Sequence, residues 1–251
     1  MSRTPRDIVA RLRALPLERG QIAFAHLGQL GFLVRIGKAV AGCDLFLSPM
    51  KGRLVPPQLR PEDVADVDFL FGTHDHADHI DKPLWRELAR IGAKARFIVP
   101  DSVRDGVIAD TGLSPAQVIG MDAGQSRTVC GVRVSAFAAA HERLERDSSG
   151  RYKALGFVLA ANGARICHSG DCCPYEGLQT TLGKLGPFTA MFLPINGRGN
   201  NMNAADAAKL ARAFHVKHAV PVHYGMLDDC SPDAFVYEGK AVLEDGVEYE
   251  I

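Results

Sequence analysis

The amino-acid sequence predicts a layered α/β fold in which β-sheets pack together and helices cover their outer faces. Short β-rich runs alternate with amphipathic helical runs along the 251 residues, and no linker or low-complexity tract divides them. Asn162 and Gly163 lie between two apolar runs, a pattern typical of a β-hairpin. Asn203, which favours a helix N-terminus, precedes an amphipathic run at residues 204–214. We therefore expect one domain that comprises residues 1–251.

The apolar patterns place the expected elements in order along the chain. The first is a helix whose apolar stripe is formed by Ile8, Val9, Leu12 and Leu15. Strands are expected in the β-rich runs at residues 22–36 (with a break near Gly28), 38–47, 67–72, 96–99, 132–138, 155–160, 164–168, 190–193 and 219–222. Helices are expected where apolar residues recur with helical spacing, at residues 83–92, 101–112, 174–182 and 204–214.

The composition excludes several classes of protein. Hydrophobic residues make up 47% and charged residues 23%, ordinary values for a globular chain, so disorder and fibrous repeats are excluded. The 29 basic and 29 acidic residues cancel, which argues against general binding to nucleic acid or anionic lipid. No stretch reaches the roughly 20 consecutive apolar residues of a membrane span, and the N-terminus lacks the apolar core of a secretory signal. Six cysteines without a C-x-x-C pair favour a reduced, cytoplasmic protein.

The most informative segment is T-H-D-H-A-D-H at residues 73–79, directly after an expected strand. His74 and His76 project to the same side of an extended loop, because side chains alternate with a period of two. Both imidazoles can therefore bind one metal ion, while Asp78 and His79 supply ligands for a second. The alternative, a solvated turn, requires no particular order of residues, and such dense unpaired charge is costly to hold together. The segment therefore predicts a metal site.

This segment resembles the H-x-H-x-D-H signature of the metallo-β-lactamase superfamily. The later ligands of that family have matching residues here, each where a strand meets a loop: His141, Asp171 and His223. The resemblance implies an αββα sandwich of two mixed sheets with helices on the outer faces. It also implies two divalent metal ions, manganese or zinc, with iron as a further alternative.

The resemblance divides the ligands between the two ions. The first ion would be bound by His74, His76 and His141, and the second by Asp78, His79 and His223, with Asp171 bridging both. Asp44 matches an aspartate that usually accepts a hydrogen bond and so orients a ligand histidine.

Two segments near the C-terminus are similar to the L-ascorbate-6-phosphate lactonase group. They are L-P-I-N-G-R-G-N-N-M-N at residues 193–203 and P-V-H-Y-G-M at residues 221–226. The similarity implies a hydrolase that opens the lactone of a small sugar acid, either phosphorylated or not. Two adjacent divalent ions lower the pKa of a shared water to roughly 7, and the resulting hydroxide attacks the lactone carbonyl. Asp171 would thus have a catalytic role as well as a ligand role.

Several side chains near these motifs are candidates for substrate chemistry. Asp75 is a candidate proton shuttle, with a salt bridge or support of the ligands as the alternative. Arg198 is a candidate for binding a phosphate or carboxylate, against a simple surface arginine. Asn196 and Tyr224 are candidate hydrogen-bonding partners of the substrate. His168 is expected to be a buried histidine or a support of the ligands.

Other functions compete with lactone hydrolysis. The same pair of ions would serve a phosphodiesterase acting on a lipid or a small molecule, whereas net neutrality argues against a nuclease. A diiron flavoprotein would need a flavin domain, a persulfide oxygenase normally uses a single iron, and a non-catalytic binding module would lack ligands. A small molecule is therefore the expected partner. The sequence leaves the oligomeric state open, with a homo-oligomer as one alternative.

Overall fold

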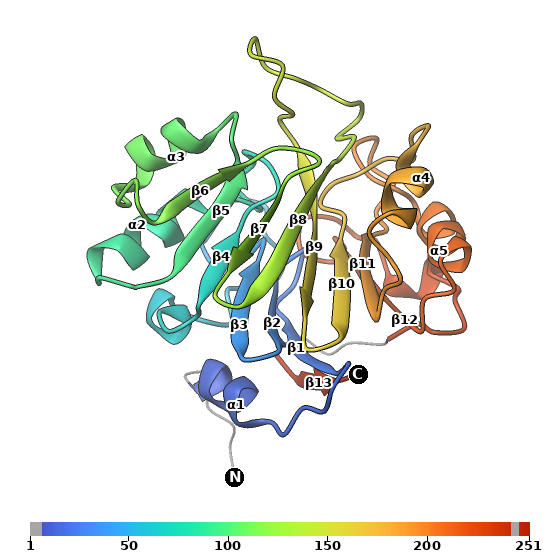
Figure 1. Ribbon diagram of the computed structural model, residues 1–251, viewed down its shortest axis with the longest axis horizontal. Helices are drawn as coiled ribbons and strands as arrows, with labels where there is room; N and C mark the ends of the chain where they lie inside the picture. Colours follow the sequence, from blue (N-terminus) through green and yellow to red (C-terminus); the bar gives the residue numbers. More distant parts are fainter. Residues whose placement is uncertain (1–6, 242–245) are drawn as a thin grey trace.

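The computed structural model describes residues 7–241 and 246–251 of the chain, and its strands form two sheets that face each other (Figure 1). The first sheet has seven strands in the order β13-β1-β2-β3-β4-β5-β6. Their bounds are β1 Ile22–His26, β2 Phe32–Ile36, β3 Ala39–Cys43, β4 Phe69–Phe71, β5 Arg96–Pro100, β6 Val118–Met121 and β13 Glu248–Glu250. The strands β3 to β6 run parallel, whereas β13, β1, β2 and β3 pair antiparallel, so the sheet is mixed.

The second sheet has six strands in the order β12-β11-β10-β9-β8-β7. Their bounds are β7 Ser126–Val129, β8 Val132–Ala138, β9 Leu155–Ala161, β10 Ala164–His168, β11 Ala190–Pro194 and β12 His218–Val222. The strands β10, β11 and β12 are parallel, and β7 to β10 are antiparallel. Asn162, at φ +49°, turns the chain between β9 and β10 beside Gly163, as the predicted hairpin requires.

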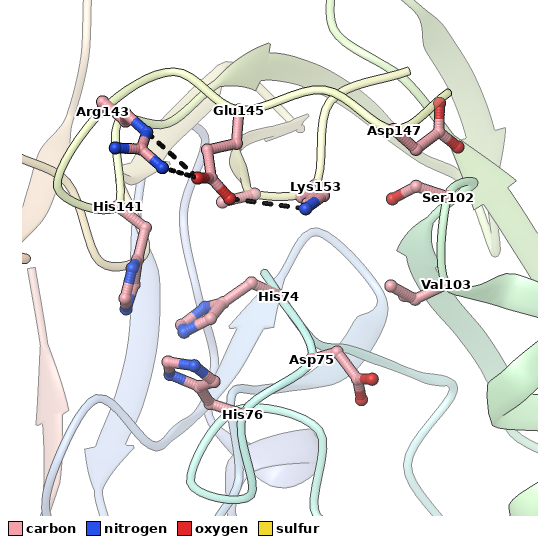
Figure 2. Close-up of a pocket in the computed structure, with 11 residues that line it drawn as sticks. His74, Asp75, His76, Ser102, Val103, His141, Arg143, Glu145, Asp147 and Lys153 are labelled. Atoms are coloured by element: carbon pink, nitrogen blue, oxygen red, sulfur yellow. Dashed lines mark hydrogen bonds and ion pairs between the residues drawn. The ribbon is translucent and has the colours of Figure 1, made fainter. Parts of the chain in front are cut away.

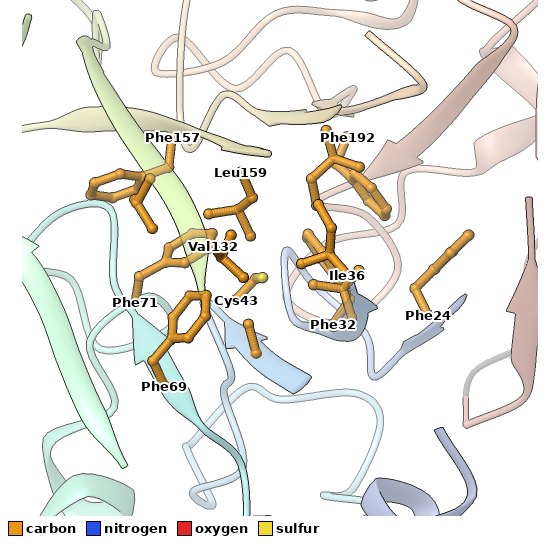
Figure 3. Packing of buried hydrophobic residues seen from close by; sticks show 14 of the residues in the cluster. Phe24, Phe32, Ile36, Cys43, Phe69, Phe71, Val132, Phe157, Leu159 and Phe192 are labelled. Atoms are coloured by element: carbon orange, nitrogen blue, oxygen red, sulfur yellow. The ribbon is translucent and has the colours of Figure 1, made fainter. Parts of the chain in front are cut away.

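The main apolar core lies between the two sheets (Figure 3). Phe32 of β2 stacks on Phe192 of β11, with ring centroids 4.0 Å apart. Phe71 of β4 packs against Phe157 of β9 at 4.9 Å. These rings are fully buried, and burial of such large apolar surfaces is the main favourable contribution to packing the two sheets together.

Helices cover the outer face of each sheet, where two further apolar clusters lie. Leu12 of α1 and Trp85 of α2 pack against the first sheet, whereas Leu182 of α4 and Leu210 of α5 pack against the second. The helices are α1 Ile8–Ala14, α2 Lys82–Arg90, α3 Arg104–Thr111, α4 Leu178–Gly183 and α5 Ala204–Ala213, with short 3-10 helices at Pro61–Val64 and Pro232–Ala234. Within the described residues, no helix has the length and apolar character needed to cross a membrane.

The predicted fold class is confirmed, and the differences concern element bounds. The helix predicted at residues 174–182 begins only at Leu178, because Gly177 has φ +91°, which a right-handed helix does not adopt. The helix predicted at residues 101–112 begins at Arg104, after a turn in which Val103 N donates to Pro100 O. Three short strands, β6, β7 and β13, were not predicted. The β7 sequence Ser-Arg-Thr-Val is mostly exposed and lacks an apolar alternation.

Candidate metal centre

The residues of the predicted metal site come together at one rim of the sandwich, at or just beyond the ends of strands. The loop after β4 carries four of them, His141 follows β8, Asp171 follows β10 and His223 follows β12. Because β10, β11 and β12 run parallel, their carboxyl ends meet at the same edge. The topology therefore positions side chains that are up to 149 residues apart in sequence.

The ligand atoms form three overlapping groups, each with atoms within 4.8 Å of one another. The groups are His74, His76 and His141; His74, His79 and Asp171; and Asp78, His79 and His223. The first and third groups share no residue, and the second connects them. The grouping offers ligand sets for one metal ion or for two neighbouring ions.

Asp171 lies between the two outer groups and faces both. Its Oδ1 atom lies 3.4 Å from His79 Nε2 and 3.2 Å from His223 Nε2, while its Oδ2 atom lies 3.8 Å from His141 Nε2. A carboxylate oriented in this way can bind one ion through each oxygen.

Several of these atoms are buried and accept or donate no hydrogen bond among the described residues. They are His74 Nε2, His79 Nε2 and Asp171 Oδ1. Buried polar atoms without partners are costly, and convergent imidazole nitrogens and carboxylate oxygens suit a divalent cation. These buried atoms without hydrogen-bond partners therefore fit a bound metal ion. Ligands of this type suit zinc, manganese or iron.

A buried hydrogen-bond network supports the cluster on the side that faces the protein interior. Asp44 is fully buried and its Oδ2 atom lies 2.8 Å from His79 Nδ1 and 3.0 Å from His168 Nε2. Thr73 donates to the same carboxylate from its backbone N (2.9 Å) and its Oγ1 (2.8 Å). Because the carboxylate only accepts, His79 carries its proton on Nδ1 and directs Nε2 toward the ligand cluster. Asp44 thus contacts both His79 and His168 on the buried side of the cluster.

Charges within the cluster shift the titration of its members. Burial opposes protonation of His79, but Asp171, Asp78 and Asp44 outweigh it and raise the pKa of His79 to about 10. Burial likewise opposes ionisation of Asp171, yet His79 and His223 hold its pKa well below the usual range. Burial and neighbouring His79 lower the pKa of His74. A metal ion must therefore compete with a proton at His79.

The loop that carries Asp171 approaches the His74 loop closely at Gly170. Gly170 has φ +61°, and a Cβ atom there would lie 2.8 Å from Thr73 Cβ and 3.0 Å from Leu155 O. A side chain at this position would push the two ligand-bearing loops apart. Glycine is therefore required for the compact centre.

Two cavities flank the cluster, and His76 lines both. The first has a volume of about 310 Å³ and lies between the loop after β4 and the segment joining β8 to β9 (Figure 2). Its lining includes three of the candidate ligands and four charged residues of that segment: His74, His76, His141, Arg143, Glu145, Asp147 and Lys153.

The second cavity, of about 300 Å³, opens on the side of Asp171 and His223. Three side-chain amides line it, from Gln29, Asn196 and Asn200, together with Arg198 at its edge. The two cavities differ in chemistry, because two cations of the segment joining β8 to β9 line the first, whereas three amides, three aspartates and one arginine line the second.

The candidate substrate residues occupy different settings. Asp75 lines the first cavity and its Oδ1 lies 2.8 Å from Lys82 Nζ, the salt bridge that was the alternative to a shuttle. Asn196 Nδ2 lies 2.9 Å from His223 Nδ1, and Arg198 Nη2 lies 2.9 Å from Asp229 Oδ1. The Tyr224 ring stacks on His26, with centroids 5.9 Å apart, and is not among the residues found to line either cavity.

Two contacts of the cluster were not predicted. Gln29 Nε2 donates to Asp78 Oδ2 (2.9 Å) and Asn200 Nδ2 donates to Asp171 Oδ2 (2.7 Å). Each amide therefore fixes one of the two carboxylates. Gln29 has φ +54° in the turn between β1 and β2, and only the folded chain brings this turn to the cluster. Asn200 lies after β11, in the segment that is similar to the lactonase group.

Two packed mixed sheets with a histidine and aspartate cluster at the strand ends define the metallo-β-lactamase fold class. A family model described as a beta-lactamase superfamily domain matches residues 35–224. A UPF0173 metal-dependent hydrolase of Myxococcus xanthus is 31% identical over 245 residues, which cover 94% of this chain and 83% of that protein. The chain therefore belongs to the beta-lactamase superfamily and, within it, to the UPF0173 metal-dependent hydrolases.

Solved structures share the fold at low sequence identity. Igni18, a metallo hydrolase from Ignicoccus hospitalis, has a TM-score of 0.74 and 19% identity over 92% of this chain and 98% of that one. An isothiocyanate hydrolase from Delia radicum gut bacteria has a TM-score of 0.70 and 15% identity over 90% and 98%. At these identities the similarity concerns the fold alone.

Proposed function

We propose that the chain is a hydrolase with two divalent metal ions that opens the lactone ring of a small sugar acid. The observation that carries the proposal is the pair of ligand groups joined through Asp171. We infer that one ion is bound by His74, His76 and His141, and the other by Asp78, His79 and His223. The ions are manganese or zinc, with iron as the further alternative.

The side chains of the chain act by holding and orienting groups around the reacting carbonyl. When bound, a pair of divalent ions lowers the pKa of water at the site and polarises a carbonyl oxygen. Asp171 would supply a ligand to either group, because its Oδ1 faces His79 and His223 and its Oδ2 faces His141. Asp44 holds His79 in a single tautomer and orientation. Asp75, at the wall of the first cavity, is the proposed carrier of the transferred proton, with Lys82 stabilising its carboxylate.

A lactone substrate is supported by the resemblance to the L-ascorbate-6-phosphate lactonase group. The two similar segments supply Asn196, Arg198 and Asn200, which line the second cavity, and Tyr224, which directly follows His223. Amide and hydroxyl groups suit the hydroxyls of a sugar acid, since each can donate or accept. We propose that Asn196 and Arg198 bind the substrate from this side. Tyr224 stacks on His26 and lines neither cavity, so its proposed role is to support the neighbouring His223.

The test uses metal-stripped protein reloaded with manganese or zinc. Acid release is followed with L-ascorbate 6-phosphate and with a neutral sugar lactone, and a bis(aryl) phosphodiester is the competing substrate. We expect about two metals per chain by elemental analysis and metal-dependent turnover of a lactone.

Two variants make the test specific to the centre. His76→Ala removes the residue that lines both cavities and is expected to abolish turnover and metal binding in its group. His215→Asn is the matched control, because His215 is exposed, lies outside the cluster, and its φ of +46° suits asparagine. Turnover of the phosphodiester alone would replace the lactone assignment, and turnover that persists in His76→Ala would refute the centre.

A further inference from the structure

We propose that Arg143 and Lys153 bind an anionic group of the substrate in the first cavity, at the place where Glu145 now lies between them. This inference rests on the proposed function and specifies its substrate class as a lactone carrying a phosphate or a carboxylate. It assigns recognition of the anion to the first cavity rather than to Arg198 in the second.

The contacts of Glu145 show what these two cations can hold. Arg143 donates to Glu145 Oε1 from both Nε (3.1 Å) and Nη2 (2.7 Å), while Lys153 Nζ lies 3.5 Å from Oε2. One carboxylate thus engages a guanidinium and an ammonium at once, the donor set that carboxylates and phosphates prefer. Figure 2 shows this trio on the cavity wall opposite His74 and His76. Glu145 is therefore an internal counterpart of the proposed ligand.

The segment that carries the two cations is fixed relative to the ligand cluster. Arg143 forms a β-bridge with His141, and a second bridge joins Arg146 to Tyr152. Lys153 N donates to Glu145 O at 3.0 Å across the same segment. Two residues after Lys153, Leu155 N donates to Thr73 O (3.0 Å), next to His74. Both ends of the segment are thus tied to the metal centre, which positions the cations for recognition.

In the first cavity, Arg143 and Lys153 share one acidic partner, Glu145. The other acidic lining residues face cations of their own: Asp75 pairs with Lys82 at 2.8 Å, and Asp147 pairs with Arg151 at 2.7 Å. The group of Arg143, Lys153 and Glu145 accordingly carries a net charge of +1. An incoming anion can displace the Glu145 carboxylate into solvent, because that side chain is 38% exposed.

The second cavity offers a weaker setting for an anion. Arg198 supplies the single guanidinium or ammonium group among the residues that line this cavity. That guanidinium already pairs with Asp229 at 2.9 Å. In addition, Asp78 and Asp228 line the same cavity and disfavour an anion.

The experiment compares three lactones on the metal-loaded protein: D-glucono-1,5-lactone, its 6-phosphate, and the carboxylate-bearing D-glucaro-1,4-lactone. In the double variant Arg143→Gln/Lys153→Gln, we expect KM for the anionic lactones to rise about tenfold or more, with kcat within about twofold, the scale of losing hydrogen bonds to a charged group. KM for the neutral lactone should not change. Glu145→Gln should lower KM for the anionic lactones, because it removes the internal competitor. The anionic lactone whose KM rises more in the double variant shows whether phosphate or carboxylate is the preferred group.

A matched control carries the same change of charge elsewhere. Arg127→Gln/Arg133→Gln alters two exposed cations of β7 and β8 and should leave all three KM values unchanged. Unaltered preference for anionic lactones in Arg143→Gln/Lys153→Gln would overturn the proposal, as would its loss in Arg198→Gln alone. If the wild-type protein hydrolyses no lactone, the proposed function fails, and calorimetric binding of 6-phosphogluconate then decides. Binding retained in the double variant refutes the anion site, and binding lost supports it.

Discussion

The buried and the exposed sides of the metal centre are built by different means. On the buried side, His79, His168 and Asp44 are at most 1% exposed and are joined by hydrogen bonds no longer than 3.0 Å. On the exposed side, Arg143 and Arg198 have side chains that are 76% and 58% exposed and that pair with nearby acids. Buried hydrogen bonds are costly to break, whereas exposed ion pairs contribute little. We infer that the buried side sets metal binding and the exposed side sets selectivity.

Asp44→Asn should have the largest effect among substitutions of residues that contact neither metal nor substrate. An amide cannot accept from His79, His168 and Thr73 together, so the orientation of His79 is lost. We expect metal affinity and kcat/KM to fall about 10- to 100-fold, the usual scale for such supporting partners. Elemental analysis after dialysis and initial rates measure both effects.

Asp68→Asn is the matched control for that variant. Asp68 also accepts hydrogen bonds, from Val40 N at 2.8 Å and from Arg13, but it lies away from the cluster. It should change thermal stability without changing metal affinity. Equal loss of metal in both variants would show that the effect of Asp44 is one of general stability.

Asn200→Leu should have an intermediate effect. Asn200 stands between the two sides, since it donates to the buried Asp171 while lining the second cavity. Loss of a hydrogen bond to a charged group should lower kcat/KM about tenfold with metal content unchanged. Steady-state rates and elemental analysis test this, with Gln179→Leu on the exposed face of α4 as control. Loss of metal in Asn200→Leu would show that Asn200 contributes to metal binding, as the buried residues do.

Arg198→Gln should have the smallest effect. The Arg198 side chain is 58% exposed, and exposed ion pairs are worth about 0.2–1 kcal/mol, so loss of one to the substrate should raise KM about two- to fivefold at most while kcat is unchanged. Asp229→Asn, which frees Arg198, is the complementary variant and should not raise KM. A change in kcat above about tenfold for Arg198→Gln would contradict the division between the two sides.

The sequence predicted packed sheets from local apolar patterns, whereas the two mixed sheets and the convergence of the candidate ligands were implied by the resemblance to the metallo-β-lactamase superfamily. The cluster T-H-D-H-A-D-H is contiguous, and the later candidates each follow an apolar run. The roles of these residues as ligands stay predictions until metal is measured. His168, expected to be buried or supporting, does lie against Asp44.

The contacts of Gln29, Asn200 and Arg143 could not be predicted in the same way. Gln29 meets Asp78 across 49 residues, and the β-bridge of Arg143 with His141 lies in a segment without apolar periodicity. Their partners are set by how the loops lie on the folded sheets, and no residue spacing encodes that. The short strand β13 was missed for a related reason, since its pairing with β1 joins the two ends of the chain.

The candidate ligands stand at or near the ends of strands, whereas the residues proposed for selectivity stand on segments that add no strand to either sheet. We therefore expect residues 142–153 and 197–199 to tolerate changes of composition, whereas residues 200–202 contact Asp171 and Cys172 and must be kept. On the proposed function, we expect reaction chemistry and choice of substrate to be encoded in separate stretches of the chain. A combinatorial library confined to those two stretches should yield new selectivities at little cost to metal content, which makes this chain a suitable starting point for laboratory evolution.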